Sequence, residues 1–304
     1  MLPIEALKSR RSIFTHRACA DGSAAAMIAK AALPHCEVRA FAYDDPEYRN
    51  LPVTPGALWL DIAPWAPPTS RKPTPDELLA RRVAMLPWVD AGAMVCDHHA
   101  SARDLVAAFG DLGVFGENTS SESGAWLAFR EVFVRRGNYS DDFHRVAHLS
   151  AVYDTWRVDS PDWRPACHLA ALLQTVPLSW CLGAPAYVVL QRADDLGTHL
   201  HADMADRAAK VAKGAVRDRI GGRNVAIVPT TEVNLLSIPE ADIIAGFRYQ
   251  PGSPRVKWSL RSSKVDVGAI AERNGGGGHK AAAGFHLADD GRSPYAQIAD
   301  LLGS

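Results

Sequence analysis

The sequence predicts an α/β fold in two parts: a parallel sheet with helices on both faces, and a smaller mixed α/β domain at the C-terminal end, joined by a long helix. Three observations support this prediction. Short apolar segments alternate with helical segments over the first half of the chain. A long helical segment then covers residues 186–220, and shorter strand-like segments follow Gly221-Gly222. We therefore expect domains at residues 1–180 and 222–304, with a helical linker at 181–221.

Each element is expected from its local pattern. In the first domain, apolar segments predict strands at 12–15, 38–42, 57–60 and 93–96, and helical segments are expected at 23–33, 76–86, 123–135 and 142–152. The proline-rich stretch 64–75 is expected to be a loop. After the long helix, which should end at Gly221-Gly222, strands are expected at 225–228, 243–249 and 255–261, and a helix at 265–273.

The composition is that of a globular protein. The chain has 304 residues, of which 47% are hydrophobic and 22% charged, with a net charge of −1. This balance argues against a protein that coats long duplex nucleic acid and favours a small substrate in a local pocket. Five cysteines without a C-x-x-C pair indicate neither a disulfide framework nor a structural zinc site. With no secretion signal and no apolar run of about 18 residues, a cytoplasmic protein without a membrane partner is expected.

Metal-ligand side chains follow three of the expected strands. His16 ends the first strand, Asp61 follows the third, and the triplet Asp97-His98-His99 follows the fourth. Ligands bind open α/β sheets outside the carboxyl ends of the strands. Singly, such a residue is more often a loop or capping residue, but the triplet is harder to explain in that way. Because adjacent histidines point in different directions, at most one of them shares a metal with its neighbours.

Asp21, Asp154 and His279 extend this set of carboxylates and imidazoles, although Asp154 alone could simply cap a turn. Mixed oxygen and nitrogen ligands suit Mn²⁺ and related divalent ions. Two such ions roughly 3.5–4 Å apart can activate a water and hold the oxygens of an in-line phosphoryl displacement. Such a centre needs one carboxylate that bridges both ions.

Taken in order, these segments resemble the DHH superfamily of phosphoesterases over nearly the whole chain. The matching segments are Thr15-His16 with Cys19-Ala20-Asp21-Gly22, Leu60-Asp61, the Val95-Cys96-Asp97-His98-His99 signature, the helix start Ser123-Gly124-Ala125, and Tyr153-Asp154. Gly275–His279, followed by Ala281–Phe285, resembles the smaller DHH-associated C-terminal domain. The ordered aspartates and the downstream GGGH make this combination far more specific than the DHH triplet alone.

The resemblance implies a role for each residue. The implied metal ligands are His16, Asp21, Asp61, His98 and Asp154, with Asp61 as the bridge between two divalent ions, Mn²⁺ or alternatively Mg²⁺. The implied catalytic residues are Asp97, His98 and His99, of which Asp97 and His99 lie beside the ligands or near the phosphate. The implied substrate-binding residues are Arg261, Gly276, Gly277, Gly278 and His279. Arg261 could equally be an exposed edge-strand charge, and the glycines could merely form a tight turn.

Cys19 departs from the family pattern, which usually has Asp at this position. Cysteine is a soft ligand, whereas Mn²⁺ and Mg²⁺ prefer oxygen. One ion therefore binds weakly, or a softer ion is used, or Cys19 is an inert packing residue near His16.

The expected function is that of a nanoRNase-like or cyclic-dinucleotide phosphodiesterase that releases nucleoside 5′-monophosphates. Its partner would be a short oligonucleotide or cyclic dinucleotide. One alternative is a RecJ-like single-strand exonuclease, although such enzymes usually carry an additional oligonucleotide-binding domain. The other is a nucleotide-binding sensor with a degraded site, which Cys19 alone favours.

Overall fold

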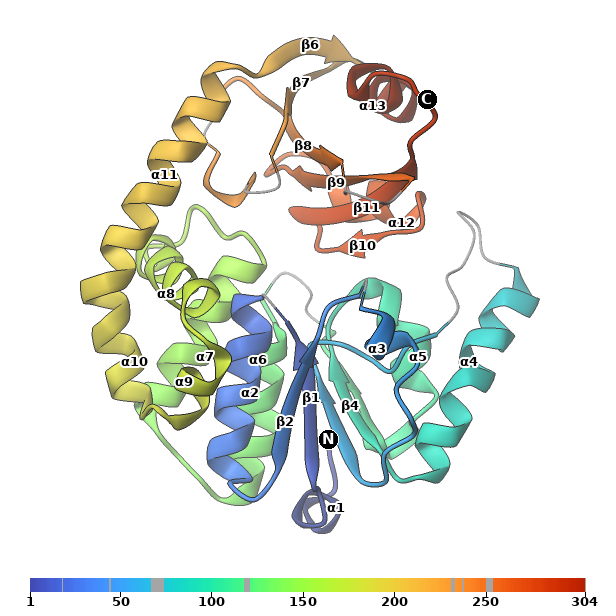
Figure 1. Ribbon diagram of the computed structural model, residues 1–304, viewed down its shortest axis with the longest axis vertical. Helices are drawn as coiled ribbons and strands as arrows, with labels where there is room; N and C mark the ends of the chain where they lie inside the picture. Colours follow the sequence, from blue (N-terminus) through green and yellow to red (C-terminus); the bar gives the residue numbers. More distant parts are fainter. Residues whose placement is uncertain are drawn as a thin grey trace. The chain divides into compact units, whose positions relative to one another are not determined.

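The chain folds into two compact units in the computed structural model, one ending at His201 and the other beginning at Ala202 (Figure 1). The two-part architecture expected from the sequence is confirmed, since each unit has its own sheet. The structure describes all residues except 18, 44, 67–73, 118–120, 231–232, 237, 250–253 and 304, so part of the proline-rich stretch lies outside it.

Within the described part of the first unit, five strands form an entirely parallel sheet in the order β2-β1-β3-β4-β5. The strands are β1 (Ser12–His16), β2 (Glu37–Phe41), β3 (Ala57–Leu60), β4 (Met94–Asp97) and β5 (Gly113–Phe115). Every residue of β3 and β4 is buried, which explains why these strands are apolar up to Asp97 and do not alternate with polar residues. The strand order reverses between β1 and β3, the switch point at which such sheets bind ligands.

Helices cover both faces of this sheet (Figure 1). They include α2 (Ala20–Ala32), α6 (Gly124–Leu127) and α7 (Asp141–Asp154) on one face, and α4 (Pro75–Asp90) and α5 (Arg103–Ala107) on the other. The alanine-rich α2 is buried along almost its whole length, because its small side chains let β1, α6 and α7 pack closely around it. Thr74 and Glu77 form a capping box that begins α4.

An aromatic cluster fills the core between the sheet and α4. The Phe14 and Trp59 rings meet edge to face with centroids 4.7 Å apart, and Trp88 of α4 lies 5.2 Å from Trp59 in the same manner. Phe41 and Tyr48 extend the cluster. Edge-to-face pairs of this kind add to the stabilisation from burial.

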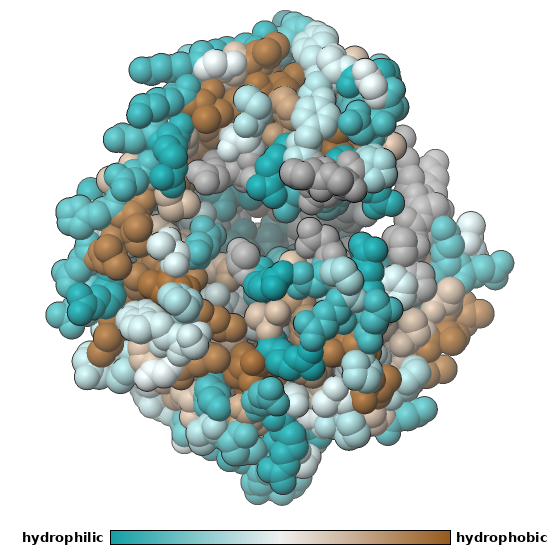
Figure 2. Space-filling model, viewed as in Figure 1, coloured by the Kyte–Doolittle hydropathy of each residue, from teal (hydrophilic) through white to brown (hydrophobic). Residues whose placement is uncertain are grey.

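The surface mixes polar and apolar residues. Figure 2 shows hydrophilic residues over much of the visible face, with apolar residues interspersed among them. Exposed apolar side chains include Leu79, Val83 and Leu86 of α4. Because apolar atoms contribute more than half of the accessible surface of an ordinary folded protein, this mixture does not by itself mark a binding site.

The second unit contains a mixed sheet in the order β10-β11-β9-β8-β7-β6. Its strands are β6 (Val216–Ile220), β7 (Arg223–Val228), β8 (Ile243–Tyr249), β9 (Arg255–Arg261), β10 (Gly277–Gly278) and β11 (Ala282–Ala288). Among the described strands of this second sheet, only the β7–β8 pair is parallel. Helices α12 (Val267–Glu272) and α13 (Pro294–Gly303) contribute to one apolar cluster of this unit, and the C-terminal part of α11 (Thr198–Lys213) contributes to another.

The prediction of one helix at 186–220 is wrong in its extent. Helix α10 (Ala186–Arg192) continues through a π-helical stretch at Ala193–Gly197 into α11, which ends at Lys213. Residues 216–220 are strand β6 instead, because pairing with β7 decides their conformation. Gly221 and Gly222, with φ of 55° and 78°, form the hairpin turn between these strands and do not end the helix.

Several elements were not expected from the sequence. They include β5, β11, α13 and the helices α1 (Ile4–Lys8), α3 (Pro46–Arg49), α8 (Trp163–Thr175) and α9 (Leu178–Gly183). The helix expected at 123–135 is present, but it becomes π-helical at Ala128–Phe133 and 3₁₀-helical at Val134–Arg136.

Candidate metal centre

The candidate site lies at the carboxyl edge of the parallel sheet. His16 is the last residue of β1, and Asp61 follows β3 directly. Thr15 pairs with Leu60 in the parallel register, so the two strands end level with each other. The Asp61 N–H donates to the carbonyl oxygen of Cys96 on β4 at 3.0 Å. The strand ends that the sequence singled out therefore meet at the switch point of the sheet.

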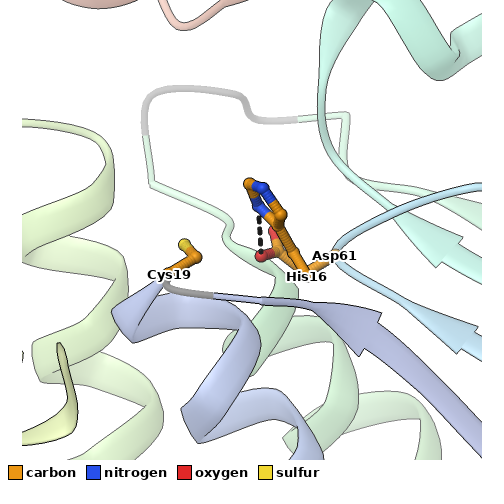
Figure 3. Close-up of side chains that lie close together, drawn as sticks. All are labelled: His16, Cys19 and Asp61. Atoms are coloured by element: carbon orange, nitrogen blue, oxygen red, sulfur yellow. Dashed lines mark ion pairs between the residues drawn. The ribbon is translucent and has the colours of Figure 1, made fainter. Parts of the chain in front are cut away.

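Asp61 is held in an uncommon backbone conformation. Its φ of 62° is left-handed, which costs a non-glycine residue on the order of 1–2 kcal/mol. Its side chain is 1% exposed, with Oδ1 lying 3.0 Å from Nε2 of His98. Oδ2 lies 3.7 Å from Nδ1 of His16 on another side (Figure 3). The two oxygens of one carboxylate therefore face two different histidines, the arrangement that a bridging ligand requires.

His98 gathers the remaining carboxylates. Its Nε2 atom lies 3.6 Å from Oδ2 of Asp21 and 3.7 Å from Oδ2 of Asp154. His98, Asp21 and Asp61 are almost fully buried, whereas the Asp154 side chain is 20% exposed. The structure thus brings together all five of the expected ligands, which come from β1, α2, the end of β3, the segment after β4, and α7.

Asp21 is positioned by the start of α6. Its Oδ2 accepts the Gly124 N–H at 2.5 Å, and its Oδ1 accepts the Ala125 N–H at 3.1 Å. A Cβ atom on Gly124 would lie 2.4 Å from the Cβ of Asp61 and 2.9 Å from Oδ2 of Asp21. Only glycine fits this position, so Gly124 belongs to the site, whereas the sequence indicates it only as part of a helix start of small residues.

Asp97, the last residue of β4, and His99, in the segment that follows, support the centre. Oδ1 of Asp97 accepts the backbone N–H groups of His98 at 2.7 Å and of His99 at 3.0 Å. The same oxygen lies 2.7 Å from Nδ1 of His99, and the His98 and His99 ring centroids are 4.4 Å apart. Asp97 therefore fixes the backbone and ring orientation of the two histidines that follow it.

The charges of the cluster depend on one another. Burial alone would raise the pKa of Asp61, but the His16 and His98 rings hold it well below its ordinary value. Burial raises the pKa of Asp21 well above its usual range, and the Asp61 and Asp154 charges add to that effect. Burial opposes the charged form of His98, yet the hydrogen bond with Asp61 and the charge of Asp154 raise its pKa to about 10. The carboxylates of Asp21, Asp61 and Asp154 converge on the single ring of His98, and that ring alone does not balance their negative charge. Such a set of oxygen and nitrogen donors fits divalent cations.

Unsatisfied polar atoms give a direct test of that fit. Asp61 Oδ2 and His16 Nδ1 are both buried and have no hydrogen-bond partner among the described residues. Buried polar atoms without partners are costly and rare. They face each other too far apart to share a hydrogen bond, and a cation bound by both would satisfy them.

Cys19 lies beside this pair. It is the N-cap residue of α2, and its Sγ, a ring nitrogen of His16 and a carboxylate oxygen of Asp61 all lie within 4.8 Å of one another (Figure 3). Burial and the neighbouring Asp61, Asp154 and Asp21 charges raise the pKa of the Cys19 thiol.

The substrate-binding residues expected in the second unit lie on its sheet. Arg261 ends β9, a strand between β11 and β8, so it is not on an edge strand. It donates from Nε to Oδ1 of Asn234 and, at 2.7 Å, from Nη1 to the carbonyl oxygen of Leu260. The side chain is therefore oriented by local contacts.

The glycine run contains β10, the first strand of a tight hairpin whose turn is closed between His279 and Ala282. A Cβ atom on Gly276 would lie 2.1 Å from the Gly284 oxygen, and Gly278 has a φ of 135°. Gly277 pairs with Gly284, and the His279 N–H donates to the Ala282 oxygen at 2.7 Å. The close packing of the hairpin is therefore enough to explain the glycines. Contact between His279 and a substrate stays a prediction.

Comparisons with known proteins agree with this architecture. Residues 209–302 match the DHHA1 domain family. Comparison with curated proteins gives no match. Among solved structures, the DHH domain of a protein described as a member of a ribosomal protein family has a TM-score of 0.58 at 12% identity, over 97% of this chain and 86% of that one.

RecJ from Thermus thermophilus, solved in complex with Mn²⁺, has a TM-score of 0.57 at 16% identity over 98% of this chain, which spans 54% of RecJ. An exopolyphosphatase-related protein from Bacteroides fragilis has a TM-score of 0.50 at 12% identity, over 98% of this chain and 93% of that one. At these identities the likeness is one of fold.

The chain thus combines a parallel α/β unit with a second unit that matches the DHHA1 domain family. The match to the DHHA1 family covers residues 209–302, and over the whole chain the fold is similar to those of the DHH-domain protein and RecJ. Among the described residues, no helix has the length and apolar character needed to cross a membrane.

Proposed function

We propose that this protein is a metal-dependent phosphodiesterase that hydrolyses short oligonucleotides or cyclic dinucleotides to nucleoside 5′-monophosphates. The observation that carries the proposal is the position of Asp61, whose two oxygens face His98 at 3.0 Å and His16 at 3.7 Å. One carboxylate between two ligand groups is what a two-ion phosphodiesterase needs.

The expected ligands form two groups, and Asp61 belongs to both. On one side, His98, Asp21 and Asp154 offer one imidazole and two carboxylates with Asp61, a set that suits Mn²⁺ or Mg²⁺. On the other side, His16 and Cys19 share Asp61. When bound, a pair of divalent ions supplies positive charge to the transferring phosphoryl group and lowers the pKa of the attacking water.

The protein's own residues orient the reacting groups. Asp97 holds the His98 and His99 backbone through two N–H bonds, which keeps the His98 ring on the carboxylate cluster. Burial lowers the pKa of His99, but the Asp97 charge raises it above the ordinary value. With Nδ1 of His99 held by Asp97 at 2.7 Å, the ring is suited to offer its other nitrogen to a phosphate oxygen.

Substrate selection is assigned to the second unit. His279 and Arg261 supply side-chain donors, and the 276–278 glycines allow close approach of a substrate to the backbone. The net charge of −1 supports a short substrate, because a long strand would need many more phosphate contacts.

A RecJ-like exonuclease is the main alternative, and this chain spans 54% of RecJ. A nucleotide sensor with a degraded site is favoured only by Cys19.

The decisive experiment incubates the full chain with Mn²⁺ and a panel of di- to pentanucleotides, cyclic dinucleotides and longer single-stranded DNA. Products are identified by mass. Release of nucleoside monophosphates from the short substrates supports the proposal. Preferential degradation of long single strands would favour the exonuclease, and tight nucleotide binding with no turnover under any divalent ion would favour the sensor.

A further inference from the structure

The ligand group around Cys19 is chemically unlike the group around His98. Its three ligand atoms, from His16, Cys19 and Asp61, lie within 4.8 Å of one another, close enough to surround one ion. Figure 3 shows the three side chains rising from the ends of their elements toward a common region. Asp61 contributes an oxygen that is buried and has no hydrogen-bond partner among the described residues. This second observation distinguishes the group from an isolated cysteine.

The Cys19 backbone is firmly placed. Its carbonyl oxygen accepts the Ser23 N–H at 3.0 Å as α2 begins. Thr15 Oγ1 donates to the Gly22 carbonyl at 2.7 Å, and a Cβ atom on Gly22 would lie 2.3 Å from the His16 oxygen. The first turn of α2 is therefore packed directly against the end of β1, and the thiol is held beside His16 by the fold.

We propose that the Cys19 thiolate ligates the ion bound by His16 and Asp61, and that this half of the centre takes a borderline ion such as Zn²⁺ in preference to Mn²⁺ or Mg²⁺. The inference rests on the metal-dependent function proposed above. Sulfur and imidazole with one carboxylate oxygen form a set that Zn²⁺ and Co²⁺ bind well, whereas Mn²⁺ and Mg²⁺ favour oxygen. The half formed by Asp21, Asp61, His98 and Asp154 keeps an oxygen-rich set. The centre is thus built for two different ions.

Binding involves no redox step. The thiol releases its proton to solvent as the sulfur–metal bond forms, and the ion comes from solution. The pair of electrons in the new bond is the sulfur lone pair, so the oxidation states of sulfur and metal are unchanged.

The test uses the metal-free full chain titrated with Co²⁺, a spectroscopic substitute for Zn²⁺. A near-ultraviolet thiolate-to-cobalt charge-transfer band is expected for the parent protein and should be lost in Cys19→Ser. The matched control is Cys36→Ser, which should keep the band. Cys36 is buried and donates to the Arg10 carbonyl oxygen at 3.3 Å, a bond that serine can retain, and it precedes β2 at the other edge of the sheet.

Competition between Zn²⁺ and Mn²⁺, followed by metal content after equilibrium dialysis, gives the second readout. Cys19→Asp should lower the Zn²⁺ affinity of this half at least about 10- to 100-fold, because changing even a residue that only supports a metal ligand typically costs that much. The same substitution should raise the affinity for Mn²⁺ relative to Zn²⁺. Circular dichroism verifies that both Cys19 variants are folded. If Cys19→Asp does not fold, the result for Cys19→Ser decides the test.

The possible results separate the two proposals. A parent protein that binds two Co²⁺ ions without the band, or a band that persists in Cys19→Ser, overturns the role of Cys19, and hydrolysis by such a protein leaves the proposed function standing. A parent protein that binds no divalent ion overturns both proposals.

Discussion

The Cβ atom that Gly124 lacks would lie 2.4 Å from the Cβ of Asp61, closer than two such carbons can approach. This contact joins the start of α6 to the end of β3. It explains why the helix begins with glycine and why its N–H can reach Asp21 at 2.5 Å.

Gly124→Ala is therefore expected to displace Asp61 and Asp21 together. A displacement of about 1 Å near a reacting centre can cost on the order of 10²-fold in rate, and a loss of that size in kcat/KM is expected. Metal affinity, measured by isothermal titration, should fall as well. Gly183→Ala is the control, because nothing described lies within 4 Å of an added Cβ there. Parent-like kinetics in Gly124→Ala would contradict the geometry.

Asp61→Asn should abolish hydrolysis while preserving the backbone. Asparagine tolerates the left-handed φ of 62° that Asp61 adopts, whereas alanine does not. The substitution removes the charge that both ligand groups share, so bound metal, measured by elemental analysis, should fall with activity. Asp61→Ala should also be inactive but adds backbone strain. Asp90→Asn, an exposed change at the end of α4, should behave like the parent. An active Asp61→Asn variant with full metal content would exclude Asp61 as the bridge.

His279→Ala tests substrate binding by the second unit. If His279 contacts the phosphate, kcat/KM should fall on the order of tenfold or more, while metal content stays unchanged. His286→Ala on the exposed face of β11 is the matched control in the same sheet. Thermal unfolding of both variants should be compared with that of the parent. A stable His279→Ala protein with parent kinetics would leave His279 a purely structural residue of the hairpin.

The Asp162 carboxylate is expected to stabilise the fold in a way that depends on pH. Hydrogen bonds from Arg145 and His148 lower its pKa from 3.8 to about 2. Both partners lie on α7, the helix that carries Asp154, and Asp162 precedes α8. Because the folded pKa is depressed, the stabilising contribution is fully present above about pH 4 and is lost as the pH falls toward 2.

Asp162→Asn should therefore lower Tm at neutral pH, and the difference from the parent should shrink as the pH falls through that window. Asp159→Asn, an exposed neighbour, is the control. Thermal melts between pH 7 and the lowest pH at which the parent still folds provide the measurement. A pH-independent difference would show that this carboxylate charge contributes nothing to stability.

The sequence predicted the location of the candidate site because of a property of parallel sheets. Every strand of such a sheet ends at the same edge, so residues after separate apolar segments must converge. His16, Asp61 and His98 can be placed together in this way from the sequence alone. Asp21 and Asp154 required the motif order as well, since their helices have no such constraint.

Other features could not be predicted from local pattern. The Val216–Ile220 segment is compatible with a helix, and only its antiparallel pairing with β7 makes it a strand. The Gly221-Gly222 pair suits both a helix end and a hairpin turn, and that pairing decides between them.

By itself, the sequence determined the α/β class, the strand ends that carry ligands, and the family resemblance, because these depend on residue type and on spacing along the chain. The tertiary structure alone decided that Asp61 turns one oxygen toward His98 and the other toward His16, and that Gly124 leaves room for both carboxylates. These features depend on close contacts between segments far apart in the chain, such as Asp21 and Gly124, and local propensities carry no information about them.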